Sequence, residues 1–245
     1  GLTAMGDWIN YLAVDNSNNK WFASVDGLIK YDDTIFTLMD TTNSNLPFEP
    51  INRILADKDT HLWISGDSKI AKYDGANWQV YSPPFTAGHI LRMTADSNNV
   101  LWLSTGVWED GFYRFDGSTW TNYTTTNSGI QSDVASVVAI DKNNLVWTNY
   151  IAGITSFDGV AWINYDNGNG SGYPAFHGAY EIQVDRFNNK WICTSDGVVV
   201  FNETGVVGVD EINQQMSALN LYPNPGKEEV TMSIEAKNSE NVTIT

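Results

Sequence analysis

The sequence repeats itself five times, and this periodicity restricts the possible folds more than any other feature. A tryptophan recurs at intervals of 39 to 45 residues, and an aspartate precedes each of these tryptophans by six positions. The five pairs are Asp15–Trp21, Asp57–Trp63, Asp96–Trp102, Asp141–Trp147 and Asp185–Trp191. A repeat of this length predicts one supersecondary unit per copy, which buries its faces against neighbouring copies.

Each copy divides into four short apolar segments that are separated by turn residues. In the fourth copy these segments span 135–140, 145–149, 153–157 and 161–165. The first connection is rich in Asn and Asp, and the third is Asp-Gly in the middle copies; both favour tight hairpins. Four antiparallel strands per copy are typical of a β-propeller blade. We therefore predict an all-β fold, a β-propeller of five four-stranded antiparallel blades over residues 1–209.

The recurrent aromatic residues indicate how the blades pack. Eight of the ten tryptophans occupy two repeat positions, so we interpret them as inter-blade core and not as a ligand-stacking platform. Five copies either close into a ring of five blades or form part of a larger ring. An open arc would expose aromatic blade faces, which favours the closed ring.

Charge and cysteine content exclude several classes of function. The formal net charge is −16, so a polyphosphate would be repelled and no nucleic-acid partner is expected. No apolar run is long enough for a transmembrane segment. A single cysteine, Cys193, excludes an internal disulfide and a thiolate metal cage. The Asp/Asn-rich turns lack the glycine and distal glutamate of an EF-hand loop, so we predict neither a metal nor another cofactor.

The repeat pattern resembles a known family. Written as I-x-x-D-x-x-(N)-N-x-x-W followed by G-[LIV]-x-x-[YF]-D-G-x-x-W-x-x-Y, it is similar to the two-component regulator propeller repeat, over residues 8–207. The resemblance implies an extracellular or periplasmic propeller of the kind found in sensory ectodomains and exported proteins of Bacteroidota-type bacteria. It also implies glycan-like ligands, and a location outside the cell or on the outer-membrane surface.

The composition changes after Val209. Residues 210–218 are interpreted as a linker, and the stretch L-x-L-Y-P-N-P that begins at Leu219 leads into alternating apolar residues. This stretch resembles the opening of the C-terminal sorting domain of the type IX secretion system. The resemblance implies that residues 219–245 are a partial sorting segment that engages the secretion machinery. The alternative is a Pro-rich linker followed by one strand pair.

Propeller topology indicates where a site lies. The short Asp/Asn turns share one face, and the long loops 41–50, 82–89, 124–133 and 166–178 share the other, where function tends to concentrate. The one insertion in the repeat, within Thr105–Gly111, is also on that face. An aromatic residue beside two carboxylates suits a sugar ring and its hydroxyls. The candidate ligand-binding residues are Trp108, Glu109 and Asp110, with Arg53, His89, Arg92, Tyr150, Tyr173, Phe176 and His177 nearby.

Three functions fit these features. The first is an exported, non-catalytic binding propeller for a glycan or a cell-surface partner, because no catalytic motif is present. The second is a polysaccharide-active glycoside hydrolase or lyase that uses carboxylates on the long-loop face. The third is a structural spacer within a surface protein. We predict no catalytic residues.

Overall fold

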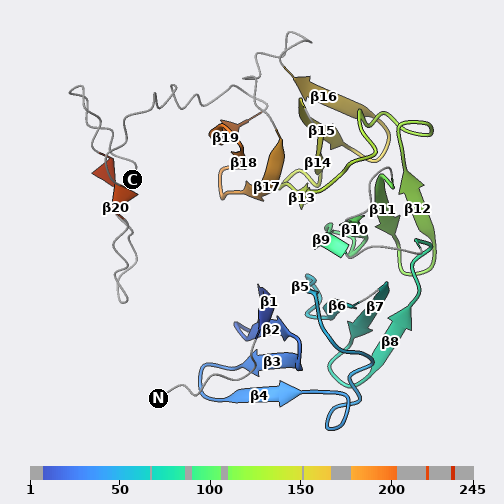
Figure 1. Ribbon diagram of the computed structural model, residues 1–245, viewed down its shortest axis with the longest axis vertical. Coiled ribbons are helices and arrows are strands. Elements are labelled where there is room, and N and C mark those ends of the chain that lie inside the picture. The colour runs from blue at the N-terminus through green and yellow to red at the C-terminus, as the bar shows by residue number, and fades with distance from the viewer. Residues whose placement is uncertain are drawn as a thin grey trace. The chain divides into compact units, whose positions relative to one another are not determined.

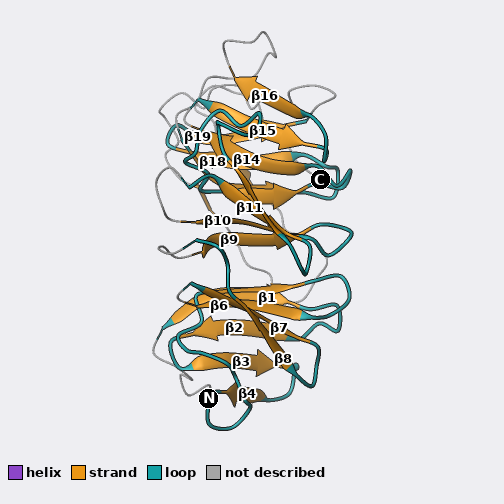
Figure 2. Ribbon diagram, turned by 90° about the vertical axis from the view of Figure 1, so that its right-hand side faces the viewer, coloured by secondary structure: helices purple, strands orange, loops and turns teal. Residues whose placement is uncertain are grey.

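The structure is a computed structural model, and its described residues are all in strands, turns and loops. No helix occurs within them (Figure 2). They are 8–66, 68–85, 90–105, 110–150, 152–166, 178–202, 219–220 and 233–234. The chain divides into two compact units, Gly1–Val206 and Val207–Thr245.

The first unit contains five antiparallel sheets, which we call the first to fifth blades in chain order. The first comprises β1 (Ile9–Val14), β2 (Lys20–Ser24), β3 (Gly27–Tyr31) and β4 (Phe36–Met39). The second comprises β5 (Arg53–Ala56), β6 (Leu62–Gly66), β7 (Lys69–Tyr73) and β8 (Trp78–Tyr81). The third comprises β9 (Ile90–Ala95), β10 (Leu101–Thr105), β11 (Phe112–Phe115) and β12 (Trp120–Tyr123).

The fourth blade comprises β13 (Val138–Ile140), β14 (Val146–Tyr150), β15 (Gly153–Phe157) and β16 (Trp162–Asp166). The fifth has three described strands, β17 (Ala179–Val184), β18 (Lys190–Thr194) and β19 (Gly197–Phe201). In every blade each strand pairs with the next in sequence, and the first strand of each lies innermost (Figure 1). The all-β propeller class is confirmed, whereas the number of blades in a complete ring stays a prediction.

Consecutive blades pack through their inner strands and a shared aromatic core. The inner strands contact one another in the order β1, β5, β9, β13, β17. Trp63, Trp102 and Trp147 each lie edge-on to an aromatic ring of the following blade, at 5.7–6.3 Å between centroids. Together with Trp21, these three tryptophans are at most 5% exposed. The interpretation of the repeated tryptophans as core therefore holds at these four positions.

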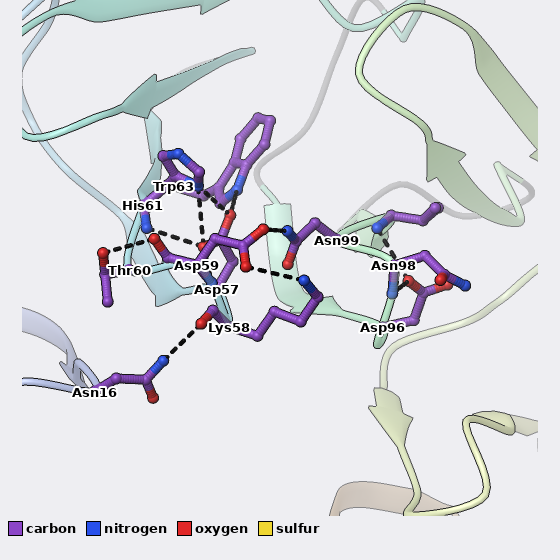
Figure 3. A network of polar contacts seen from close by, with 11 residues as sticks. Asn16, Asp57, Lys58, Asp59, Thr60, His61, Trp63, Asp96, Asn98 and Asn99 are labelled. Atoms are coloured by element: carbon purple, nitrogen blue, oxygen red, sulfur yellow. Dashed lines mark hydrogen bonds and ion pairs between the residues drawn. The ribbon is translucent and has the colours of Figure 1, made fainter.

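The repeated aspartate organises the first turn of every blade. Its Oδ1 accepts two backbone amides of the turn, and its Oδ2 accepts the indole N–H of the tryptophan six residues later. In the second blade these donors are Asp59, His61 and Trp63, all bonded to Asp57 (Figure 3). The indole bond recurs in all five blades at 2.8–3.3 Å. Each Asp–Trp pair thus joins a hairpin turn to the blade core.

The same turns also connect neighbouring blades. One turn residue in each blade has a left-handed backbone with φ between 60° and 68°, and it is asparagine in every blade except the second, where it is Thr60. Ser97 N–H donates to Asn144 Oδ1 at 2.7 Å, and Lys142 N–H donates to Asn188 Oδ1 at 2.8 Å. Asn99 makes a bond of the opposite sense, because its Nδ2 donates to the carboxylate of Asp59 in the second blade (Figure 3). Asparagine serves here because it tolerates this conformation and carries an amide that reaches the turn of the preceding blade.

The interface between the fourth and fifth blades contains a buried ion pair. Lys190 is fully buried, its Nζ lies 2.9 Å from Asp141 Oδ2, and it sits 4.6 Å from the centre of the Trp147 ring. Burial alone raises the pKa of Asp141, but the bonds from Lys190, Leu145 and Trp147 outweigh it and lower that pKa. Asp141 is therefore charged and holds the fifth blade's lysine against the fourth blade.

The second unit has one described strand pair. β20 (Leu219–Asn220) runs antiparallel to β21 (Ser233–Ile234), with Leu219 opposite Ile234. The identification of residues 219–245 as a sorting segment, and of 210–218 as a linker, stays a prediction.

Candidate functional site

The inner strands of the five blades line a central channel. The cavity has a volume of about 360 Å³, and each inner strand contributes to its wall. Each blade contributes an apolar residue at the position three before the turn aspartate, namely Leu12, Ile54, Met93, Val138 and Ile182. Charged side chains enter this wall at Arg92 and Glu181. The channel wall thus combines apolar residues from every blade with a polar region that contains charged side chains.

That polar region arises from a single position of the repeat. The residue four before the turn aspartate is Tyr11, Arg53, Arg92, Val137 and Glu181 in the five blades. Each lies in the half of its inner strand away from the hairpin turns, or just before that strand, on the side where the long loops enter. We call these five residues the collar. Tyr11, Arg92 and Glu181 line the channel, whereas Val137 is fully buried in the core between the fourth and fifth blades, and Arg53 reaches from the second blade to the third.

Arg92 and Glu181 form an ion pair between the third and fifth blades. Arg92 Nε donates to Glu181 Oε2 at 2.8 Å, and Nη2 lies 2.7 Å from the same oxygen. Nη1 donates to the carbonyl of Leu91 at 2.8 Å, and Gln183 donates to the other carboxylate oxygen of Glu181 at 3.0 Å. Both side chains are about a quarter exposed, so the pair is open to solvent and to a ligand.

Arg53 connects the first three blades. Its Nε donates to the Leu91 carbonyl at 2.7 Å, Nη1 donates to the Asn52 carbonyl at 2.8 Å, and the guanidinium lies 5.1 Å from the centre of the Tyr11 ring. Burial, together with the positive charge of Arg92, lowers the pKa of Arg53. It remains a cation, and among the described residues no carboxylate forms an ion pair with it.

Asp110 and Tyr150 form hydrogen bonds with residues of their own blades. Asp110 accepts from Tyr113 Oη at 2.8 Å and from Thr105 Oγ1 at 3.2 Å, and burial together with this carboxylate raises the pKa of Tyr113. Tyr150 is 6% exposed, and its hydroxyl donates to the Tyr165 carbonyl at 3.4 Å. Neither residue belongs to the channel wall. Arg53 and Arg92, in contrast, both donate to the Leu91 carbonyl, so the structure brings these two candidates together.

The remaining candidates fall outside the described residues. They are His89, Trp108, Glu109, Tyr173, Phe176 and His177. Their part in ligand binding stays a prediction.

Two collar residues were missed by the sequence reasoning. Glu181 and Tyr11 were not candidates, although they occupy the same register as Arg53 and Arg92. They are found by aligning the five repeats and comparing the residue at this one position, which we call a column of the repeat. Loop length does not reveal them. A column that contains different polar residues in successive blades indicates a position that packing does not dictate.

The described residues show neither a metal centre nor a membrane helix. Within them, no three His, Cys, Asp or Glu side chains are grouped so as to hold a metal ion. None of the elements described is a helix of the length and apolarity required to cross a bilayer.

Comparison with known proteins identifies the fold. No protein-family model and no curated protein matches the chain. Among solved structures, it is similar to the extracellular domain assigned to a hybrid two-component system of B. thetaiotaomicron (TM-score 0.63, 14% identity). It is also similar to PorZ, a bacterial surface component of the type-IX secretion system of Porphyromonas gingivalis (0.63, 17%), and to virginiamycin B lyase of Staphylococcus aureus (0.64, 12%).

These similarities differ in extent. The match covers 94%, 91% and 95% of this chain, but 32%, 36% and 82% of the three solved chains in the same order. The chain therefore spans about a third of the length of the first two. At such identities the likeness shows the fold, a β-propeller, in agreement with the repeat pattern.

Proposed function

We propose that this protein is an exported, non-catalytic binding propeller, whose collar and long loops hold a glycan or a glycan-bearing surface partner. The observation that carries this proposal is the collar itself. On a chain of net charge −16, Arg53 and Arg92 converge on the Leu91 carbonyl beside the channel wall, where Arg92 pairs with Glu181. Arg53 itself forms no ion pair with a carboxylate in the described part of the chain.

The collar chemistry favours an acidic, hydroxyl-rich ligand. Arg53 offers a planar donor for a carboxylate, the Arg92–Glu181 pair offers a donor and an acceptor for hydroxyls, and Tyr11 adds an aromatic ring. An acidic polysaccharide presents these groups together. Asp110 already accepts two hydrogen bonds inside its blade, which supports binding over catalysis for this carboxylate.

Calorimetric titration with acidic and neutral polysaccharides tests the proposal. The wild type is expected to bind an acidic polysaccharide, and Arg53→Met is expected to weaken that binding by about 10- to 100-fold, because a hydrogen bond to a charged group contributes about 1.5–3 kcal/mol.

Arg114→Met provides the matched control. Arg114 lies on β11 and pairs with Asp116 in the turn after that strand, so this substitution removes the same charge away from the collar. It is expected to leave binding unchanged. Equal loss in both variants would mean that net charge alone attracts the ligand. Lack of binding to any polysaccharide or envelope protein would reject the proposal, and turnover of a polysaccharide that is lost in Glu109→Gln would favour the hydrolase or lyase.

The proposed location rests on different support. The similar extracellular domain and the similar surface component agree with a propeller that works outside the cell. We propose that residues 219–245 direct this export as a sorting segment. Secretion of the full chain by a host with a type IX system, compared with a chain that lacks these residues, tests it: equal secretion of both would contradict the proposal.

A further inference from the structure

Two blade faces are exposed to solvent: the face of the fifth blade that points away from the fourth, and the face of the first blade that points away from the second. Trp191 of the fifth blade is 41% exposed, whereas the equivalent tryptophans of the other blades are at most 5% exposed. Val198 is 53% exposed, whereas its counterparts Leu28 and Ile154 are fully buried. On the opposite side of the first blade, Leu12 is 51% exposed, whereas its counterparts Ile54 and Ile182 are 2% exposed. Both faces therefore retain residues of the blade-to-blade pattern without the contact that buries them.

A lysine on the first blade indicates what would cover that face. Lys20 stands immediately before Trp21, as Lys190 stands immediately before Trp191. Lys190 reaches into the preceding blade and binds its turn aspartate, Asp141. Lys20 has the same register and pairs instead with Asp33 of its own blade. Its position matches a neighbour that carries an Asp–Trp pair like that of the fourth blade.

The two uncovered faces border one opening. β1 and β17 both line the central channel, yet Figure 1 shows the fifth blade, in orange, and the first blade, in blue, standing apart, while the other inner strands follow one another closely. The hydrophobic clusters also end there: each of the four lies between two consecutive blades, and none joins the fifth blade to the first among the described residues.

From these observations we infer that the opening accepts further blades of the same repeat, joined to this chain. The blade beside β1–β4 presents an Asp–Trp pair to Lys20 and apolar residues to Leu12. The blade beside β17–β19 presents an apolar face to Trp191 and Val198. The five blades are then an arc of a larger ring. Burial of exposed apolar area drives this closure, and the lysine fixes the register.

The reactivity of the single cysteine shows whether the exposed face of the fifth blade is covered. Cys193 is exposed, whereas the residues at the same position in the first three blades, Ala23, Ser65 and Ser104, are fully buried under the next blade. In the 245-residue chain its thiol is expected to react freely with DTNB without denaturant, in a monomer. A blade placed over this face abolishes that reactivity.

An extended chain tests the inference. A copy of residues 90–177, which holds the third and fourth repeats and no cysteine, is inserted before residue 8. The copied Asp141 then meets Lys20, and the copied third blade meets the fifth. We expect loss of Cys193 reactivity under native conditions and its return in denaturant. Lys20→Glu is expected to lower the denaturation midpoint of the extended chain by more than that of the original chain, where it breaks only the pair with Asp33.

Three outcomes would overturn the inference. Protection of Cys193 in the original monomer would mean that the five blades close on themselves. Protection that appears only in an oligomer as concentration rises would mean that a second copy covers the face. Full reactivity in an extended chain whose added blades have folded, as judged by circular dichroism and a steeper denaturant dependence, would mean that the faces do not accept blades.

Discussion

The two ends of the blades differ in how far they repeat: the end with the Asp/Asn turns is the same in every blade, and the end with the long loops is not. At the turn end, all five blades make the same bonds: an aspartate accepts two amides and an indole N–H. At the loop end, the collar position holds two arginines, a glutamate, a tyrosine and a valine. The turn end thus repeats what a blade needs in order to fold, whereas the loop end differs from blade to blade, from the fully buried Val137 to the partly exposed Arg92–Glu181 pair.

This difference separates stability from binding. Substitutions at the turn end are expected to change the free energy of unfolding without changing ligand affinity, and Arg53→Met in the collar is expected to do the reverse. A turn-end variant that lost affinity while keeping its stability would break the comparison.

The largest effect is expected for Asp141→Ala. This substitution leaves the fully buried Lys190 without its carboxylate and frees the Trp147 indole N–H. Removing one partner of a buried ion pair costs about 3–5 kcal/mol. Denaturant unfolding measures the loss, and the double variant Asp141→Ala with Lys190→Met is expected to recover part of it. A loss below that of Asp185→Ala would contradict the role given to the pair.

The second largest effect is expected from acid, which lowers the free energy of unfolding by protonating the aspartates of the turns. Hydrogen bonds from Thr34 lower the pKa of Asp32 to about 2, and the Thr119 and Ser118 amides and the Ser118 hydroxyl lower that of Asp116 to about 2. The unfolded chain takes up these protons near pH 3.8, so between about pH 4 and 2 it binds more protons than the folded chain. Stability is therefore complete above about pH 4 and falls as the pH drops towards 2. Thermal melts across this range test it, and a constant midpoint would contradict it.

Sequence reasoning identified the turn end well because its signals are local. The Asp–Trp spacing and the Asn/Asp turns lie within a few residues of one another, so their hydrogen bonds follow from register alone. The Arg92–Glu181 pair joins residues 89 positions apart and exists only because the ring brings them to one channel. Arg53 and Arg92 were found from loop topology, whereas Glu181 required comparison of the same position across blades.

The exposed face of the fifth blade illustrates the same limit. The repeat pattern predicts that Trp191 is core, as Trp147 is, because both stand six residues after the turn aspartate. The structure leaves Trp191 41% exposed because burial depends on the neighbouring blade and not on the residue's own blade. A sequence pattern specifies which face is apolar, but not whether that face is covered.

Asp185→Ala sharpens this contrast and is expected to have a smaller effect than Asp141→Ala. Burial by itself raises the pKa of Asp185, but hydrogen bonds from Trp191, Asn189 and Phe187 outweigh it and lower that pKa to about 2. No described lysine pairs with this carboxylate. Loss of a turn-capping aspartate costs about 1 kcal/mol, which denaturant unfolding resolves. A cost equal to that of Asp141→Ala would show that the turn bonds, and not the buried lysine, dominate at both sites.

The smallest effect is a gain, expected for Thr60→Asn. Thr60 has φ 68°, a left-handed conformation that β-branched residues disfavour, and it occupies the position held by Asn18, Asn99, Asn144 and Asn188 in the other blades. An asparagine relieves this strain and carries an amide oxygen for the Asn16 N–H of the first blade, as Asn144 does for Ser97. The free energy of unfolding is expected to rise by about 0.5–1 kcal/mol. Thr60→Gly relieves the strain without adding the amide, so the difference between the two variants measures the bond between the turns; equal stability of both would mean that this bond contributes nothing.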